Sequence, residues 1–300
     1  MFLTVLSHIG NDKCNLKNKK LQALKMEKIV NGLKNGDTIL YVGMGIYEGA
    51  EFSDGSAVPF DSDSMILAMN EGRAMAPRLM YEYTRAAMSI EQNRGRKFLE
   101  QKMSFLFAKA PQKVKVLELV EKLKPKYIID MNYDFEIPKM YSNEPHYVII
   151  GKARIGAELD RFEIMEWDNG AKKYEKVDKE FLRLDMPIIF KPMGSISPNP
   201  TFIISDADFV DWLTEAMGGF AVPPSLKEYR DGKQYLMLGL GFAKDTERMV
   251  ANELTLGLSG GYFVYAKEPT KNCLKFLKSH NMELIAENPN DFAAKLLEVV

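Results

Sequence analysis

The strongest constraint on the fold is a series of short apolar runs of β-prone residues that alternate with amphipathic helical patterns along the chain. Residues 39–42 and 127–130 form the first two runs, and neither alternates regularly between apolar and polar residues. Such runs are typical of strands that a sheet buries on both faces. Strands that alternate with helices predict an α/β protein with a doubly wound, mostly parallel sheet. Further strands are expected at 188–190, 202–204, 235–238, 262–265 and 282–285, and further helices at 17–35, 206–217, 245–257, 269–280 and 289–299.

Two segments depart from this alternation, and we expect both to be insertions in a single domain of residues 1–300. Residues 145–186 carry strand patterns around the turn Asp168-Asn169-Gly170, which predicts a small β-rich insertion made of hairpins. Residues 64–124 are predicted to form a helical insertion, and Pro111 suits the first turn of its last helix. The helices of this insertion are expected at 64–92, 94–109 and 111–124.

The composition excludes several classes of function. A formal net charge of −1 gives no reason to expect nucleic acid or an anionic membrane as a partner. The two cysteines, Cys14 and Cys273, are too few for a four-cysteine zinc site or a disulfide framework, and we expect no metal. The apolar start of the chain is too short for a signal peptide. No run approaches the ~20 apolar residues of a membrane helix, so we expect a cytoplasmic protein.

The residues that follow the predicted strands carry the functional signal. Gly43-Met44-Gly45 comes directly after the run at 39–42, and glycines there let backbone N–H groups approach a phosphate closely. The third glycine of a dinucleotide fingerprint is missing, because position 48 is Glu. A tight turn between two elements is therefore the alternative explanation of these glycines.

Three more strand ends carry glycine or polar residues. Asn132 and Asp134 follow the run at 127–130, where they suit either ribose recognition or ordinary turn capping. Ligands of open α/β sheets bind beyond the carboxyl ends of the strands, so four strand ends of this character together favour a bound nucleotide. The remaining candidates are Gly194 and Ser195 after the strand at 188–190, and Gly239, Gly241 and Asp245 after the strand at 235–238.

Histidine gives only weak candidates for a catalytic base. The chain has His8, His146 and His280, and none follows a strand of the predicted crevice. His146 is the best of them, because it comes soon after the segment at 132–134. No spacing indicates a Ser-His-Asp triad or a metal cluster. Clustered acids near helix starts fit capping instead, and these are Asp61, Asp63, Asp206, Asp208 and Asp211.

Taken in order, these segments resemble the SIR2-like family of NAD-binding proteins, which includes the sirtuins. Gly43-Met44-Gly45 is similar to the Gly-Ala-Gly turn of that family, and residues 127–134 resemble its Thr-x-Asn-x-Asp strand end. Residues 190–196 resemble its Lys-x-His-Gly-Ser segment, and the resemblance runs in order from about residue 36 to residue 300. It implies a Rossmann-like fold, NAD or ADP-ribose as the ligand, and assembly into a homo-oligomer.

The chain also departs from the family pattern. The catalytic histidine of the family falls on Met193, whose thioether accepts no proton at neutral pH. Met44 replaces the smaller Ala of the glycine turn, and the zinc-binding cysteines of the deacetylases are absent, which argues against protein deacetylation. Bacterial relatives without that zinc module often hydrolyse NAD. Asn132, which orients a water or a ribose in them, is present here.

Three functions follow from these expectations. The chain is a sensor or regulatory protein that binds NAD or ADP-ribose through the strand-end residues, without turnover. Alternatively, it is a divergent NAD glycohydrolase in which Asn132 and Asp134 act, with His146 as a candidate base. A third alternative is an oligomeric scaffold with a vestigial nucleotide site.

Overall fold

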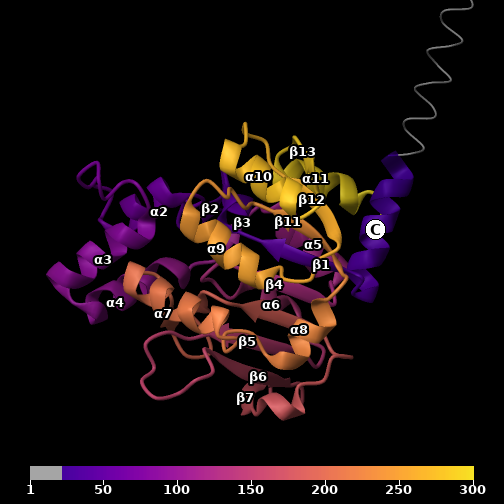
Figure 1. Cartoon of the computed structure of the whole chain (residues 1–300), viewed down its shortest axis with the longest axis horizontal. Coiled ribbons are helices and arrows are strands. Elements are labelled where there is room, and N and C mark those ends of the chain that lie inside the picture. The colour runs from indigo at the N-terminus through magenta and orange to yellow at the C-terminus, as the bar shows by residue number, and fades with distance from the viewer. Residues whose placement is uncertain (1–21) are drawn as a thin grey trace, which may run out of the picture.

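The computed structural model describes residues 22–300, and a nine-stranded sheet lies at its centre (Figure 1). The strand order is β13-β12-β11-β1-β4-β8-β5-β6-β7. The strands from β13 to β5 run parallel, β6 is antiparallel to β5, and β7 is antiparallel to β6. The predicted α/β class with a mostly parallel, Rossmann-like sheet is confirmed. The strands are β1 (Thr38–Val42), β4 (Tyr127–Asp130), β5 (Tyr147–Gly151), β6 (Phe162–Asp168), β7 (Lys173–Val177), β8 (Ile188–Lys191), β11 (Gln234–Leu238), β12 (Gly260–Val264) and β13 (Met282–Ile285).

Helices cover both faces of the sheet. Successive residues of each buried strand point to opposite faces, so each strand contributes side chains to two separate cores. In β1, Ile39 and Tyr41 belong to one large core, and Leu40 and Val42 belong to the other. The first core packs against α2 (Ser62–Met69), α3 (Tyr83–Arg94), α4 (Arg96–Phe107), α7 (Asp206–Met217), α8 (Pro224–Arg230), α9 (Asp245–Leu254) and α10 (Lys271–Ser279). The second core packs against the helical residues 22–35, the 3-10 helix η1 (Met44–Tyr47), α5 (Lys115–Leu123), α6 (Glu136–Met140) and α11 (Pro289–Leu297).

The helix α5 shows how the sequence fixes these layers. Val116, Leu119, Val120 and Leu123 recur at helical spacing and are all buried in the second core. The helix ends at Leu123, and the capping residue Lys124 adopts the left-handed conformation with φ 51°. A short connection then leads into β4, which pairs with β1.

The segment 64–124 is helical in part, but the predicted boundaries are wrong. α2 ends at Met69, and an irregular connection over residues 70–82 precedes α3, so no single helix spans 64–92. Gly72 lies in this connection with φ 80°, a conformation that no α-helix contains. α5 begins at Lys115 because Pro111 pairs with Phe52 in a small sheet of β2 (Glu51–Phe52) and β3 (Pro111–Gln112).

The segment 145–186 contains the expected hairpin around the turn at 168–170, since β6 and β7 pair there. However, it continues the central sheet, because β5 pairs with β8 and then with β6. The prediction that residues 202–204 form a strand of the central sheet is wrong. There, β10 (Thr201–Phe202) pairs with β9 (Gly194–Ser195) in a separate hairpin. The next two residues, 203 and 204, are buried without strand structure, which explains the apolar pattern.

Some predictions lie outside the described residues. They concern the apolar start of the chain, His8, Cys14 and the beginning of the helix expected at 17–35. Across residues 22–300, we find no helix that combines the length and the apolar character needed to cross a membrane.

Candidate functional site

The strand order reverses at β1. From β1 the chain proceeds to β4, β5 and β8 on one side, and it later returns to β11, β12 and β13 on the other side. The carboxyl ends of β1 and β11, which pair with each other, therefore meet at the point where ligands of open α/β sheets bind. Gly43 follows β1 there, and Gly239 follows β11.

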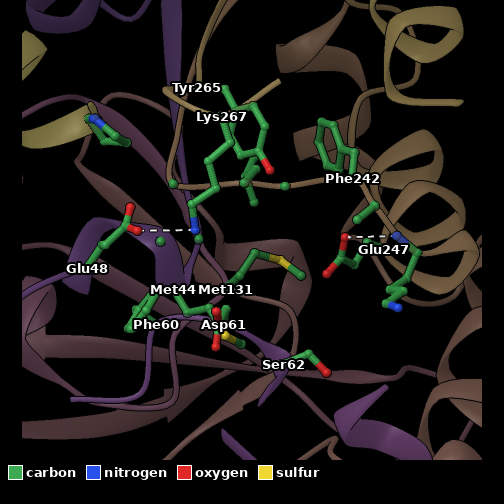
Figure 2. Close-up of a pocket in the computed structure, with 18 of the residues that line it drawn as sticks. Met44, Glu48, Phe60, Asp61, Ser62, Met131, Phe242, Glu247, Tyr265 and Lys267 are labelled. Atoms are coloured by element: carbon green, nitrogen blue, oxygen red, sulfur yellow. Dashed lines mark hydrogen bonds and ion pairs between the residues drawn. The ribbon is translucent and has the colours of Figure 1, made fainter. Parts of the chain in front are cut away.

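A cavity of about 340 Å³ lies at this point. Its walls come from the turns after β1, β4, β11 and β12 and from the first residues of α2, α3, α9 and α11 (Figure 2). This volume is at the lower end of the ~300–1,000 Å³ range of small-molecule sites. The strand-end residues that the structure brings together in this wall are Gly43, Met44, Gly45, Gly239 and Gly241.

The turns after β1 and β11 approach each other closely, which explains why glycine occupies positions 43, 45 and 239. A Cβ atom on Gly43 would lie 2.7 Å from the carbonyl oxygen of Gly239, and one on Gly45 would lie 2.8 Å from the same oxygen. The N–H of Gly45 donates to that oxygen at 2.9 Å, and the N–H of Gly43 donates to Leu238 at 2.9 Å. Both N–H groups are therefore engaged within the protein instead of facing a phosphate.

Gly241 differs from the other glycines of the cavity wall. A Cβ atom built on it would have the hydroxyl oxygen of Tyr265, 4.0 Å away, as its nearest neighbour. Gly241 therefore has no packing reason to be a glycine, and its missing side chain leaves space inside the cavity.

Aromatic and thioether side chains form much of the remaining wall. Phe242 lines the cavity in the left-handed conformation with φ 51°, which costs a non-glycine residue about 1 kcal/mol. Its ring stacks on Phe263 with the ring centres 5.3 Å apart, so packing holds the residue in this conformation. Flat apolar surfaces of this kind suit a planar heterocyclic ring. The other large apolar side chains of the wall include Met44, Phe60, Tyr83, Met131 and Tyr265.

Charged side chains meet on one side of the cavity. Glu48, which follows η1, pairs with Lys267 beyond β12, and their Oε1 and Nζ atoms are 3.1 Å apart (Figure 2). The same Nζ lies 5.5 Å from the centre of the Phe60 ring. Asp61 caps α2 by accepting a hydrogen bond from the N–H of Ser64 at 2.9 Å, as the capping interpretation predicted. Carboxylate oxygens placed in this way suit the hydroxyl groups of a sugar.

The predicted residues at the end of β4 lie outside the cavity wall. Asn132 is buried, and its N–H and its Nδ2 both donate to Asp130 at 3.0 Å. Asp134 is also buried and accepts a hydrogen bond from the hydroxyl of Tyr47 at 2.7 Å. The side-chain oxygen of Asn132 has no partner in the described structure. A role of either residue in ligand binding stays a prediction.

A buried ion pair that no sequence pattern predicted holds this strand end. Lys191 at the end of β8 donates from Nζ to Asp130 at 2.6 Å and to the carbonyl oxygen of Asn132 at 2.6 Å. Burial raises the pKa of Asp130 above its ordinary range, and Asp134 adds to this effect, whereas Lys191 opposes it. The pair therefore fixes the ends of β4 and β8 to each other.

The residues around the expected histidine position are also packed away from the cavity. Met193 is 1% exposed and belongs to the first core. Gly194 adopts φ 90°, and a Cβ atom there would lie 2.1 Å from the carbonyl oxygen of Thr201. Ser195 is buried in the β9–β10 hairpin, and Asp245 is exposed and pairs with Arg248 at the start of α9.

The histidines of the described region lie elsewhere. His146 precedes β5, at the amino edge of the parallel sheet, whereas the cavity opens at the carboxyl edge. Its Nδ1–H donates to the carbonyl oxygen of Glu144 at 2.9 Å, so its Nε2 accepts from the hydroxyl of Tyr174 at 2.7 Å. Burial lowers the pKa of His146 to about 4. His280 ends α10 and stacks on Phe276.

A scan against models of protein families finds no match to the chain, and no curated protein sequence matches it significantly. The SIR2-like resemblance therefore stays a prediction. Within residues 22–300, no three His, Cys, Asp or Glu side chains are grouped so as to hold a metal ion.

Sequence reasoning missed several residues of the cavity wall. Tyr265 and Lys267 directly follow the strand β12, so the strand-end rule applied to every strand would have found them. Phe60 and Asp61 directly precede α2 and do not follow a strand of the central sheet, so the strand-end rule does not find them. Glu247 lies in the first turn of α9, where it reads as an ordinary helix-starting acid.

Proposed function

We propose that this chain binds a nucleotide, NAD or ADP-ribose, in the cavity between the ends of β1 and β11, and acts as a sensor or regulatory protein. The observation that carries the proposal is the coincidence of a cavity of about 340 Å³ with the point of strand-order reversal. The SIR2-like pattern of strand ends supports the same class of ligand.

The wall of the cavity supports a division of roles. Tyr265 offers an aromatic ring to the heterocyclic ring, and Met131 and Phe242 add apolar surface (Figure 2). Glu48 and Asp61 offer carboxylate oxygens to ribose hydroxyl groups, in the way that acids of dinucleotide sites do. The volume suits one half of a dinucleotide, so the other half extends past the cavity mouth.

The position of Met193 supports binding over turnover. Its thioether accepts no proton, and it is buried in the core away from the cavity wall. Loss of a general base typically slows a reaction by about 10²–10⁴-fold. Among the described residues, the cavity wall contains no histidine either, so a nucleotide held there meets no imidazole base from them.

A divergent NAD glycohydrolase is the second candidate, favoured by one observation. The carboxyl group of Glu247 lines the cavity, and its pKa is raised, which is a common property of catalytic carboxyl groups. In such a reaction, water would cleave NAD into nicotinamide and ADP-ribose. The oligomeric scaffold and the homo-oligomer also remain proposals.

Gly241→Leu tests the proposed function, because Gly241 lines the cavity and a Cβ atom there has no neighbour closer than 4.0 Å, so a larger side chain would occupy cavity space. We expect wild-type protein to bind ADP-ribose or NAD in calorimetric titrations, and Gly241→Leu to bind at least about tenfold more weakly. The matched control is Gly170→Leu in the exposed β6–β7 turn, which should bind as wild type does. Absence of binding by wild type, or equal binding by Gly241→Leu, contradicts the proposal. Nicotinamide released from NAD by wild type but not by Gly241→Leu favours the second candidate.

A further inference from the structure

Glu247 occupies a distinctive place in the cavity wall. It is the third residue of α9, and the turn that leads from β11 into this helix also supplies Gly241 and Phe242 to the wall. Figure 2 shows its carboxyl group facing the space between Phe242, Tyr265 and Met131. These are the apolar surfaces assigned above to a heterocyclic ring, so Glu247 lies at the edge of that ring.

The two carboxyl oxygens of Glu247 have different surroundings. Oε2 accepts a hydrogen bond from the N–H of Lys244 at 3.3 Å, which caps the first turn of α9. This contact fixes the orientation of the carboxyl group, and the other oxygen is directed into the cavity (Figure 2). A neutral carboxyl group in this position donates one hydrogen bond, whereas a carboxylate donates none.

The surroundings favour the neutral form. Burial raises the pKa of Glu247 above its ordinary value of 4.5, and the neighbouring carboxyl group of Glu82 raises it further. The backbone N–H groups of Lys244 and Ala243 and the ammonium group of Lys244 oppose this rise. Burial likewise raises the pKa of Glu82, and Asp206 on α7 adds to this effect. The carboxyl group of Glu82 therefore disfavours a negative charge on Glu247.

Among the other titratable groups around Glu247, Lys244 supplies a positive charge, and it lowers the pKa of this carboxyl group by less than burial raises it. Burial raises the pKa of each phenol and thiol among them, and that of Cys273 rises to about 11, so these groups stay neutral near pH 7. The cations nearby are both on or next to α9 itself. The groups that face Glu247 are Tyr41 on β1, Glu82 and Tyr83 at the start of α3, Tyr265 after β12, Cys273 on α10, and Lys244 and Arg248.

We infer that Glu247 selects the ligand of this cavity by donating a hydrogen bond from its carboxyl group to an acceptor atom of the heterocyclic ring. The inference rests on the proposed nucleotide site and assigns to Glu247 the recognition of the base by a hydrogen bond. It makes nucleotide affinity dependent on the proton that Glu247 carries. Ligand binding is strongest at low pH and weakens as the pH rises through the raised pKa of this carboxyl group.

Substitutions at position 247 separate this role from helix capping. Glu247→Gln keeps the cap, since Gln serves in a capping box as Glu does, and its amide donates a hydrogen bond at every pH. Glu247→Met keeps the length of the side chain and removes the donor. Glu82→Gln removes the neighbouring negative charge and should move the pH midpoint of binding downward. Glu253→Gln, on the same helix but outside the cavity wall, is the matched control.

The experiment is calorimetric titration with ADP-ribose from about pH 5 to about pH 8, a window that lies above the ordinary glutamate pKa. We expect the affinity of wild type and of Glu253→Gln to fall about tenfold across this window, the equivalent of one lost hydrogen bond. Glu247→Gln should keep its affinity throughout, and Glu247→Met should bind about tenfold more weakly than wild type at the lowest pH.

The outcomes distinguish the inference from the proposed function. If wild type binds ADP-ribose but Glu247→Gln shows the same pH profile, the inference is overturned and the nucleotide site stands. Equal affinity of Glu247→Met and wild type at low pH overturns it as well. If wild type binds neither ADP-ribose nor NAD at any pH, the proposed function and the inference both fail.

Discussion

Removal of the Lys191 ammonium group should destabilise the protein strongly. Lys191 and Asp130 are both 0% exposed, and Lys191→Met leaves the Asp130 carboxyl group buried without its cation. Breaking a buried ion pair from one side typically costs about 3–5 kcal/mol. The carbonyl oxygen of Asn132 also loses its 2.6 Å hydrogen bond from Lys191, which places the cost in the upper part of that range.

The expected cost converts into a measurable shift of the melting temperature. A chain of this length loses roughly 2 °C for each kcal/mol, so Lys191→Met should lower Tm by about 8–10 °C in differential scanning calorimetry. The double variant Asp130→Leu/Lys191→Met should recover much of the loss, because an apolar pair leaves no charge buried. Lys173→Met is the control, since Lys173 pairs with Glu175 on the exposed strand β7 and should cost less than about 1 kcal/mol.

Two results would refute this reasoning. A decrease of less than about 2 °C for Lys191→Met would show that the ion pair contributes little to stability. A double variant less stable than either single variant would show that the charges themselves, and not the burial of one unpaired charge, hold β4 and β8 together.

Three further predictions concern stability and the position of the site. The folded-state pKa of His146 is about 4 and its ordinary value is 6.5, so as the pH falls this imidazole takes up a proton in the unfolded chain before it does so in the folded protein. Stability from this residue is complete above pH 6.5 and is lost as the pH falls towards 4, by up to about 3 kcal/mol; urea unfolding of His146→Asn should show a flatter pH dependence. Gly239→Ala should cost several kcal/mol by thermal melting, because its Cβ would lie 2.4 Å from the N atom of Ile46, whereas Gly49→Ala, with open space, should cost only about 1 kcal/mol. Met193→Ala should cost about 2–5 kcal/mol yet leave ADP-ribose affinity unchanged in titrations; a large change in affinity would place the ligand at the family histidine position instead.

The sequence allowed the main sheet to be predicted where the strands were buried on both faces. The runs at 39–42, 127–129 and 235–238 are apolar on consecutive residues, and each lies in a central strand. The same signal failed at 202–204, because residues 203 and 204 are buried in a connection and burial alone makes a run apolar. A helix over 64–92 was predicted for a related reason. Met75 and Met80 pack against the core from the irregular connection, and their spacing imitates a helix.

The alternation of buried strands with helices can be recognised in the sequence, and it predicts that a ligand binds at the carboxyl edge of the sheet. Which strand ends are neighbours depends on the pairing of the strands in the folded protein. Because β11 pairs with β1, Gly239 and Gly241 join the turn at Gly43, while the turn after β12 adds Tyr265. Asn132 and Met193 follow strands on the other side of β1 and pack into the protein instead. Strand order depends on pairing between residues up to about 200 positions apart, such as Leu40 with Leu236, and no local pattern records that choice.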